Sequence, residues 1–303
     1  MKHYLALLLS LSILLSGCVA VVPGPEQIDN KTTKPTEETT PTGWVTEAAQ
    51  TFYIRDDGSR QVGWLELDGK RYYFDNAGVM QTGWLELGDD TYYLQTDGSA
   101  AVGKVSIDSL NHYFAATGTE IILVNPWNMV PSDYIPTIKD IEDGYSIDKS
   151  CKDALEEMLA ACRAAGHGVE IISGYRRNST QITLYNNKVN YFLDQGLEPA
   201  KAREEAGKIV AKPGTSEHEL GLAVDLVDTD YTGLDEAQEN TDTQKWLMEH
   251  CWDYGFILRY PNNKTEKTGI IYEPWHYRYV GKEIAKQLRE TGLCLEEYLE
   301  SLS

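Results

Sequence analysis

Hydrophobic and polar positions follow two different patterns along the chain, and the change falls near residue 122. Between residues 43 and 122, short apolar runs of strand length recur with glycines between them, which is typical of β-strands joined by tight turns. From residue 123 on, apolar residues recur every three or four positions, with short apolar runs between these segments. This second pattern predicts an α+β region.

The first pattern is a repeat with a period of twenty residues. Each unit contains a short strand, a turn, an aromatic strand and a glycine turn, which predicts one β-hairpin per unit. A single hairpin is too small to be stable alone, so the units are expected to stack into a solenoid that shares aromatic surface. The recurring residues are Gly43, Gly63, Gly83 and Gly103; Trp44, Trp64 and Trp84, with Lys104 in the fourth unit; Tyr53, Tyr73, Tyr93 and Tyr113; and Gly58, Gly78, Gly98 and Gly118.

The second pattern predicts a series of helices and short strands. One helix has Cys151, Leu155, Met158 and Cys162 on a single face. The stretch 216–226, SEHELGLAVDL, is expected to be a loop followed by a strand. Helices are expected over residues 148–165, 179–193, 199–211 and 243–254, with two short ones at the end of the chain, and further strands over 169–172, 256–258 and 269–272.

The N-terminus has the features of a targeting segment. Lys2 precedes an apolar run over residues 4–15, which is too short to span a bilayer and long enough for a signal-peptide core. The run ends in Leu15-Ser16-Gly17-Cys18, which resembles the bacterial lipobox. The resemblance implies a lipoprotein signal peptide over residues 1–17 and a lipid anchor on Cys18, which would hold the protein at the extracellular face of the cytoplasmic membrane. A plain secretory signal is the alternative.

Residues 18–42 are rich in Thr, Pro and Glu and offer little to bury, so they are expected to form a disordered linker. The net charge is −20, and both the repeats and the region after them are acidic. This charge argues against nucleic-acid binding, which needs a basic face.

Four cysteines follow the lipobox cysteine. Cys151 and Cys162 lie eleven positions apart on one expected helix and cannot reach each other. Pairing with Cys251 or Cys294 in an oxidising compartment and free buried thiols both remain open. The chain has no C-x-x-C pair, so a zinc site made of thiolates is not expected.

Three separate segments carry polar residues that secondary structure does not explain. They contain His218 with Asp225, Glu273 with His276, and Arg176 at the end of a strand. Taken alone, the polar residues of each segment are readily interpreted as hydrogen-bonded core residues or solvated charges. Together, two imidazoles and one carboxylate make a catalytic zinc set with an open fourth position. Glu273 would then serve as the general base, and Arg176 would hold the developing oxyanion.

The H-E-x-x-H pattern of one metalloprotease class is absent, because position 222 is leucine. Glu219 is therefore not expected to be the base. We expect Glu217 and Glu219 to face solvent.

The order of these motifs closely resembles the VanY-type D-Ala-D-Ala carboxypeptidases. The resemblance spans about residues 125–303 and rests on Ser173-Gly174-Tyr175-Arg176 with Gln181, Ser216-x-His218-x-x-Gly221-x-x-x-Asp225, FILRYP at 256–261, EPWH at 273–276 and WHYRYVG at 275–281. It implies the hedgehog/DD-peptidase fold, with a small antiparallel sheet, surrounding helices and one zinc ion.

The resemblance also assigns roles to residues. His218, Asp225 and His276 would bind zinc, Glu273 would be the general base, and Arg176 would stabilise the tetrahedral intermediate. Trp275 would be either a wall of the substrate site or a core aromatic that orients His276. The residues implied for the substrate site are Tyr175, Gln181, Ser216 and Trp275.

The repeats resemble the choline-binding or cell-wall-binding repeats of Gram-positive surface proteins, whose aromatic cages hold choline or glycans. A second tryptophan of that family is replaced here by Thr51, Arg71, Thr91 and Asn111. Binding of a choline-bearing or glycan polymer and a purely structural spacer both remain open. The candidate wall-binding residues are Trp44, Trp64, Trp84, Tyr53, Tyr73 and Tyr93.

The sequence therefore predicts four parts: a signal peptide over residues 1–17, a linker over 18–42, repeats over 43–122 and a zinc peptidase domain over 123–303. The expected activity is removal of the C-terminal D-Ala from peptidoglycan stem peptides. One alternative is an L,D-carboxypeptidase that acts on tetrapeptide stems. Another, from a different class, is a cell-wall-binding lipoprotein without catalysis.

Overall fold

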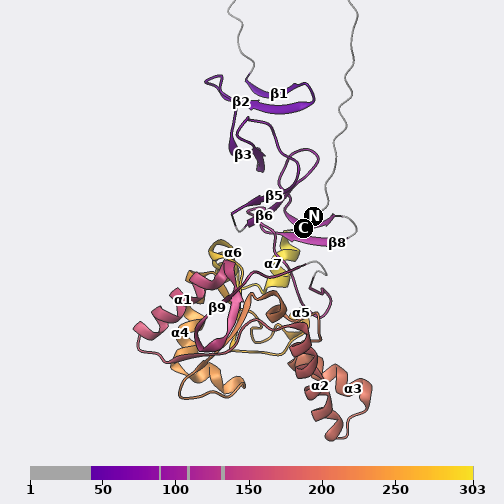
Figure 1. Ribbon diagram of the computed structural model, residues 1–303, viewed down its shortest axis with the longest axis vertical. Helices are drawn as coiled ribbons and strands as arrows, with labels where there is room; N and C mark the ends of the chain where they lie inside the picture. Colours follow the sequence, from indigo (N-terminus) through magenta and orange to yellow (C-terminus); the bar gives the residue numbers. More distant parts are fainter. Residues whose placement is uncertain (1–41, 89, 108–109, 131–133, 303) are drawn as a thin grey trace, which may run out of the picture. The chain divides into compact units, whose positions relative to one another are not determined.

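Four β-hairpins in a row form the repeat region of the computed structural model, which describes residues 42–88, 90–107, 110–130 and 134–302 (Figure 1). The prediction of one hairpin per twenty residues is confirmed, since each hairpin is an antiparallel pair of neighbouring strands. The pairs are β1 (Gly43–Glu47) with β2 (Gln50–Ile54), β3 (Gly63–Leu67) with β4 (Lys70–Phe74), β5 (Gly83–Leu87) with β6 (Asp90–Leu94), and β7 (Gly103–Ile107) with β8 (Leu110–Phe114).

The turn of the second hairpin explains its sequence. Asp68 and Gly69 both have positive φ, at 52° and 73°. Two consecutive positive φ angles define a type I′ turn, whose twist matches that of the strands. This turn fixes the register that places Trp64 directly opposite Tyr73. The same register pairs Trp44 with Tyr53 in the first hairpin.

Backbone hydrogen bonds join each hairpin to an earlier unit. The amide of Met80 donates to the carbonyl of Thr51 at 2.8 Å, and the amide of Ala100 donates to that of Arg71 at 2.7 Å. The spacing of 29 residues repeats in the bond from Glu120 to Thr91 at 2.7 Å. These bonds satisfy strand edges that an isolated hairpin would leave open, as a solenoid requires.

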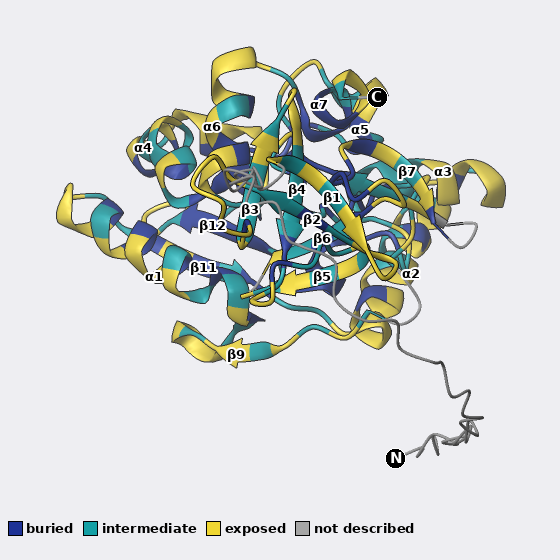
Figure 2. Cartoon of the chain, turned by 90° about the horizontal axis from the view of Figure 1, so that it is seen from above, coloured by how far each residue is buried: buried dark blue, intermediate teal, exposed yellow. Residues whose placement is uncertain are grey.

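A four-stranded antiparallel sheet in the order β11-β12-β14-β13 organises the region after the repeats. Its strands are β11 (Val169–Ser173), β12 (Ala223–Asp228), β14 (His276–Tyr279) and β13 (Phe256–Leu258). Helix α1 (Lys149–Ala164) buries Leu155 and Met158 in the same core as Ile171 and Leu226 of the sheet. Strand β12 is buried along most of its length (Figure 2).

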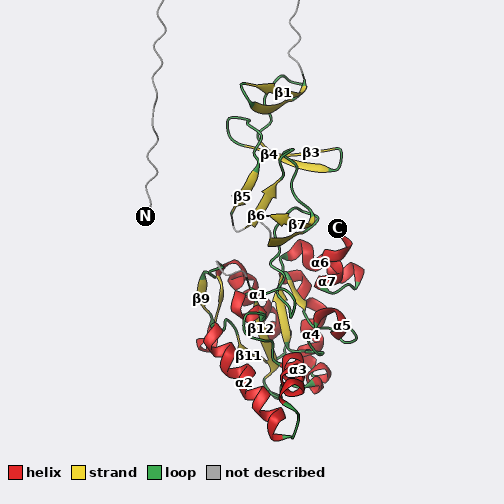
Figure 3. Cartoon of the chain, turned by 90° about the vertical axis from the view of Figure 1, so that its right-hand side faces the viewer, coloured by secondary structure: helices red, strands yellow, loops and turns green. Residues whose placement is uncertain are grey.

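Helices and short helical turns make up most of the remaining structure, in contrast to the repeats (Figure 3). The predicted α+β class is confirmed. A two-stranded ribbon of β9 (Ile138–Asp140) and β10 (Ser146–Asp148) precedes α1. The other α-helices are α2 (Asn178–Asp194), α3 (Pro199–Ile209), α4 (Asp242–His250), α5 (Thr265–Thr268), α6 (Lys282–Thr291) and α7 (Leu295–Ser301), and the 3-10 helices are η1 (Glu142–Gly144), η2 (Glu217–Leu220), η3 (Glu236–Asn240) and η4 (Cys251–Tyr254).

The strand expected over residues 269–272 is wrong. Helix α5 ends at Thr268, and Gly269 caps it with a φ of 77°. The amide of Ile271 then donates to the carbonyl of Lys208 instead of to a sheet strand. Pro274 has no N–H group to offer a ladder, and pairing begins only at His276. The expected helix over 243–254 is also divided, because α4 ends at His250 and η4 follows.

The repeats and the following region share a hydrophobic core. Ala115, Ile121 and Leu123 pack in one cluster with Leu288 of α6 and Tyr298 of α7. All described residues accordingly belong to one compact unit. Ile121 and Leu123, which follow the last hairpin, are therefore packed parts of this core.

The four cysteines among the described residues, Cys151, Cys162, Cys251 and Cys294, are all buried free thiols, which is one of the two alternatives that the sequence left open. Burial raises the pKa of Cys162 to about 11, so its thiol stays protonated and unreactive at neutral pH. Within the described ranges, no helix is both long and apolar enough to cross a bilayer.

Gly221 closes η2 with a φ of 73°, and a Cβ placed there would lie 3.0 Å from the Asp148 amide nitrogen. We expect Gly221→Ala to lower the free energy of unfolding by about 2–4 kcal/mol, because a left-handed residue and a backbone clash add together. Gly292 is the matched control, since it has a φ of 67° and nothing within 4 Å of the added atom. Urea unfolding should show Gly292→Ala losing only about 1–2 kcal/mol. Equal losses in the two variants would contradict the clash.

Candidate active site

His218 is positioned by the turn that Gly221 closes. It lies in η2, and its Nδ1 is 2.8 Å from the carbonyl oxygen of Gly174. A carbonyl can only accept, so Nδ1 carries the proton and Nε2 has a free lone pair. Nε2 lies 3.2 Å from Oδ2 of Asp225. This imidazole is therefore prepared to bind a metal through Nε2.

Asp225 and His276 meet because β12 and β14 are antiparallel neighbours that pair these two residues directly. Oδ1 of Asp225 lies 3.0 Å from Nδ1 of His276. The side chains of residues opposite each other in a sheet project to the same face. Both residues are buried. The sheet register thus brings together two residues that are 51 positions apart in sequence.

The three side chains fit a zinc ion. One ligand atom from each of His218, Asp225 and His276 lies within 4.8 Å of the other two. Bonds of about 2.0–2.2 Å at tetrahedral angles place neighbouring donors about 3.3 Å apart, close to the contacts that Asp225 makes here. Two imidazoles and one carboxylate leave one position open, as catalytic zinc requires.

Arg176 lies against the carboxylate of this triad. Its Nη2 donates to Oδ2 of Asp225 at 2.8 Å, and its Nε donates to Oγ of Ser173 at 2.8 Å. Burial, together with the nearby Arg176 charge, lowers the pKa of His218 to about 4. His218 is therefore neutral at physiological pH, as metal binding requires.

Glu273 is the second carboxyl group at the site. One of its carboxylate oxygens lies 3.7 Å from Nδ1 of His276. Burial, together with the Asp225 charge, raises the pKa of Glu273 to about 8. A carboxyl group with a pKa near neutrality can both accept and release a proton during a reaction.

A cavity of about 510 Å³ opens onto these residues. Its wall includes the three residues of the triad together with Glu273 and Arg176. Ser216 and Trp275, expected at the substrate site, also line it. Apolar side chains such as Ile209, Ile270 and Ile271 form another part of the wall.

Gln181 and Tyr175 are not among the described residues that line the cavity, so the prediction that they line the substrate site is not supported by the geometry. Gln181 is fully buried, and its amide donates to the carbonyl of Ala211 at 2.7 Å. Its Oε1 lies 3.5 Å from Nη1 of Arg176. Gln181 therefore contacts the guanidinium of Arg176 and helps to hold it in place.

The expectation that Glu217 and Glu219 face solvent is wrong, because both are buried. Glu219 accepts hydrogen bonds from Asn178 and from the backbone of Gly214, each at 2.7 Å. Oε1 of Glu217 accepts from Arg259 at 2.8 Å and from Arg278 at 2.9 Å. Burial alone would raise the pKa of Glu217, but these two arginines hold it well below its usual range.

Sequence reasoning also missed Tyr260, which lines the cavity with its ring centroid 4.8 Å from that of His276. A signal for the buried arginines was present. Arg259 follows the apolar strand β13 directly, and an arginine beside a buried strand needs a buried carboxylate partner.

The wall-binding candidates form regular aromatic pairs in the repeats. Trp64 makes edge contacts with Tyr73 at 5.2 Å and with Tyr92 of the next unit at 4.9 Å. Trp44 pairs in the same way with Tyr53, and Trp84 with Tyr93. Trp44 and Trp84 stay 43% and 45% exposed. Their rings therefore pack against the tyrosines and are also accessible to a ligand from solvent.

Arg71 stands where the related repeats have a second tryptophan. Its guanidinium carbon lies 4.3 Å from the centroid of the Trp64 ring, so a cation already covers this aromatic face. Cys18, the expected lipid site, lies outside the described residues.

Comparison with known families agrees with both halves of the chain. Residues 144–282 match the VanY family, described as D-alanyl-D-alanine carboxypeptidase. Residues 62–104 match the choline-binding repeat family.

Individual relatives point to the same chemistry. A D-alanyl-D-alanine carboxypeptidase of Enterococcus faecalis is 41% identical over 60% of this chain and 66% of its own length. A crystal structure of a mutant VanY D,D-pentapeptidase from a VanB-type vancomycin-resistance cassette, in complex with Zn(II), is 41% identical with a TM-score of 0.54. It matches 59% of this chain and 97% of that one. The structure of the LD-carboxypeptidase LdcB is 34% identical with a TM-score of 0.52, over 66% of this chain and 94% of that one.

Metal binding should release protons. Burial alone would lower the pKa of His276, but its contacts with Asp225 and Glu217 raise it to about 9, so the metal-free imidazole holds a proton at neutral pH. A metal ligand must be deprotonated, so zinc should displace about one proton per ion, and its affinity should rise with pH up to about pH 9. Calorimetric titration at neutral pH in two buffers of different ionisation enthalpy measures this. Identical heats in the two buffers would contradict it.

Proposed function

Because the chain belongs to the VanY family of D-alanyl-D-alanine carboxypeptidases, we propose that it is a zinc-dependent enzyme that removes the C-terminal D-Ala from peptidoglycan stem peptides. The observation that carries this proposal is the convergence of five side chains on one cavity. They are His218, Asp225, His276, Glu273 and Arg176. Together they provide a metal site, a base and an anion-binding group for hydrolysis of an amide.

His218, Asp225 and His276 would hold the metal. When bound, zinc supplies a Lewis acid that polarises a carbonyl and lowers the pKa of a coordinated water towards neutrality. Two of the ligands lie on the paired strands β12 and β14, and a site carried by strands is held more precisely than one carried by loops.

Glu273 would move the proton. Its carboxylate accepts a proton from the attacking water and then gives it to the nitrogen of the departing D-alanine as the C–N bond breaks. The apolar surroundings that raise its pKa to about 8 make both transfers accessible near neutral pH. This is the role expected of an acid and base that acts twice in one turnover.

Arg176 would stabilise negative charge on the carbonyl oxygen in the transition state. Its side chain is 20% exposed and lines the cavity, so it can reach a bound substrate. Ser173 and Gln181 fix the guanidinium in place, which lowers the cost of orienting it during the reaction.

The similarity to a D-alanyl-D-alanine carboxypeptidase and to a D,D-pentapeptidase favours a pentapeptide stem ending in D-Ala-D-Ala as the substrate. The similarity to an LD-carboxypeptidase supports a second candidate, a tetrapeptide stem. Retention of both Glu273 and Arg176 at the cavity argues against a protein that only binds the wall, since binding alone requires neither group.

We further propose that the protein works at the outer face of the cytoplasmic membrane. The lipobox-like stretch ending at Cys18 supports a lipid anchor, and the Thr- and Pro-rich residues 18–42 would give reach from the membrane. The match to the choline-binding repeat family and the half-exposed tryptophans support binding of a choline-bearing or glycan wall polymer through the repeats.

Incubation of the enzyme with synthetic pentapeptide and tetrapeptide stems tests the activity. The proposal expects release of D-Ala from the pentapeptide, and loss of that release when a chelator removes zinc. Release from the tetrapeptide alone would favour the L,D alternative. Release from neither peptide by zinc-loaded protein would reject the proposed function.

Glu273→Gln tests the mechanism within the same assay. We expect kcat to fall by about 10²–10⁴-fold with zinc still bound, because the amide cannot accept the proton. Glu266→Gln is the control, since Glu266 is exposed and does not line the cavity. Full activity in Glu273→Gln would remove Glu273 from the mechanism.

Cell fractionation tests the proposed location. Cys18→Ala should move the protein from the membrane fraction to the wall or the medium, because no lipid can be attached. Replacing both Trp44 and Trp84, the two exposed tryptophans of the repeats, by alanine in that variant should then release the protein from purified walls or choline resin. Membrane retention of Cys18→Ala would refute the anchor, and unchanged wall retention of the tryptophan variant would leave the repeats as a spacer.

A further inference from the structure

One buried atom of the metal ligand His276 and one buried atom of Glu217 face each other without a hydrogen bond. Oε2 of Glu217 and Nε2 of His276 are 3.7 Å apart. Their residues are only 1% and 4% exposed. Across the described residues, just one other buried side-chain nitrogen or oxygen, Nε of Arg71, lacks a partner. An unsatisfied buried polar group is costly, so a pair of them facing one another calls for an explanation.

The orientation of His276 supplies that explanation. Its Nδ1 points towards Asp225 and the other ligand atoms, which leaves Nε2 on the far side of the ring, towards Glu217. A histidine that binds a metal through one nitrogen usually donates its other N–H to a carboxylate or carbonyl. The Glu217 carboxylate is the acceptor that faces this nitrogen, at 3.7 Å.

We infer that Glu217 is a positioning residue for the metal ligand His276. Its Oε2 accepts the Nε2 proton, which fixes the tautomer whose Nδ1 lone pair faces the metal. This inference rests on the proposed zinc site, but it concerns how the protein holds a ligand and does not depend on which peptide is cleaved.

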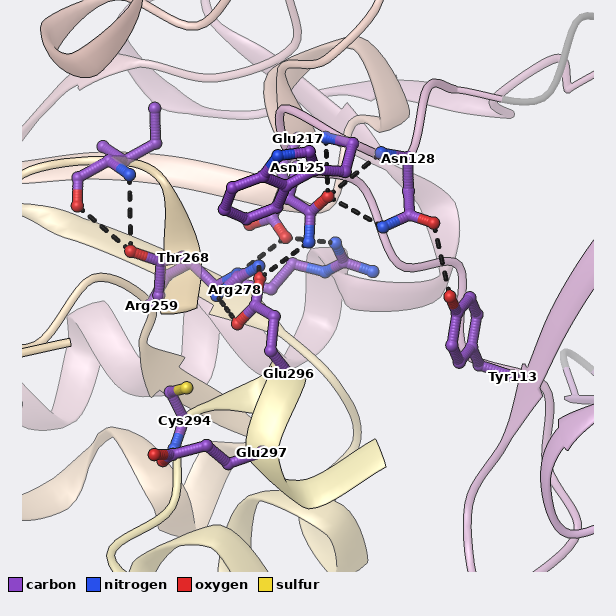
Figure 4. A network of polar contacts seen from close by, with 12 residues as sticks. Tyr113, Asn125, Asn128, Glu217, Arg259, Thr268, Arg278, Cys294, Glu296 and Glu297 are labelled. Atoms are coloured by element: carbon purple, nitrogen blue, oxygen red, sulfur yellow. Dashed lines mark hydrogen bonds and ion pairs between the residues drawn. The ribbon is translucent and has the colours of Figure 1, made fainter. Parts of the chain in front are cut away.

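Two buried arginines hold Glu217 in this orientation. Arg259 and Arg278 are 0% and 1% exposed, and both donate to Oε1, which leaves Oε2 for the histidine. Arg259 also forms a bidentate pair with Glu296, at 2.9 and 2.6 Å. Two glutamates and two arginines form a quartet without net charge (Figure 4). Pairing of this kind is what allows four charges to be buried.

The quartet extends to the segment that follows the last repeat. Arg278 donates to the carbonyl of Ile122 at 3.0 Å, and the Asn125 amide donates to Oε1 of Glu296 at 3.1 Å. Asn128 donates to Asn125 at 2.8 Å and accepts from Tyr113 of β8 at 3.3 Å (Figure 4). Residues 122–128 are thus part of the support of the metal site, as well as a connection between repeats and sheet.

Glu217→Gln tests this inference directly. The amide keeps the shape of the side chain and loses the charged acceptor, so we expect zinc affinity to fall by about 10–100-fold. Competition between the purified protein and a chromophoric chelator measures that affinity without substrate. Glu219→Gln is the matched control, because this buried carboxylate on the same 3-10 helix contacts Asn178 and Gly214 instead of a ligand. Its zinc affinity should stay within about twofold of the wild type.

A second variant guards against a folding defect. Glu217→Gln leaves two buried arginines with one carboxylate, so the protein could lose stability for reasons unrelated to zinc. The double variant with Arg278→Gln removes one positive and one negative charge. We expect its thermal midpoint to recover relative to Glu217→Gln while its zinc affinity stays low. Wild-type zinc affinity in either folded variant would overturn the inference.

Asn125→Ala tests the part played by the segment after the repeats. Loss of its bonds to Glu296 and Asn128 should weaken zinc binding severalfold, less than Glu217→Gln does. Trp127→Ala is the control, because this side chain is 65% exposed and its backbone N–H still donates to Asn125. Equal zinc affinity in the two variants would separate residues 122–128 from the metal site.

The zinc readout keeps this inference distinct from the proposed function. A wild-type protein that binds zinc but cleaves neither peptide rejects the function and leaves the role of Glu217 standing. If the wild type is active, Glu217→Gln should lower kcat at equal KM under limiting zinc, because fewer molecules carry the metal. Normal zinc binding in active Glu217→Gln would reject the positioning role and leave the function standing.

Discussion

The carboxylate of Asp225 is the group around which the site is organised. It is buried, and an isolated charge in such a place would be strongly destabilising. Contacts at 3.2 Å to His218, 3.0 Å to His276 and 2.8 Å to Arg176 stabilise it. The sheet order makes these contacts possible. Strand β12, which carries Asp225, lies between β11 and β14, so the segment after β11, the helix η2 and His276 of β14 can all reach the carboxylate.

A second group of buried charges lies next to the metal ligands. Glu217, Arg259, Arg278 and Glu296 carry no net charge together, yet each is buried and depends on the others. Removing one member would leave an uncompensated buried charge, which typically costs about 3–5 kcal/mol. These four residues connect the metal ligands to α7 and to the segment after the repeats. The same hydrogen bonds and ion pairs therefore stabilise the fold and hold the metal site.

The sequence allowed much of the site to be predicted, because spaced motifs on predictable elements carry it. The residues His218, Asp225, Glu273, His276 and Arg176 do come together. Glu217 was misjudged because local pattern does not show that two arginines, 42 and 61 residues away, are buried against it. The burial of Gln181 was not foreseen for a similar reason, since its amide donates to the carbonyl of Ala211, 30 residues away. The strand expected over residues 269–272 failed because apolar residues there line a cavity instead of a sheet.

The most direct test of the account is a crystal structure of the zinc-loaded protein with anomalous data at the zinc edge. We expect one ion between Nε2 of His218, the Asp225 carboxylate and Nδ1 of His276, at about 2.0–2.2 Å from each. We also expect Nε2 of His276 within hydrogen-bond distance of Glu217. An ion at another position, or one bound through Nε2 of His276, would contradict the central claim.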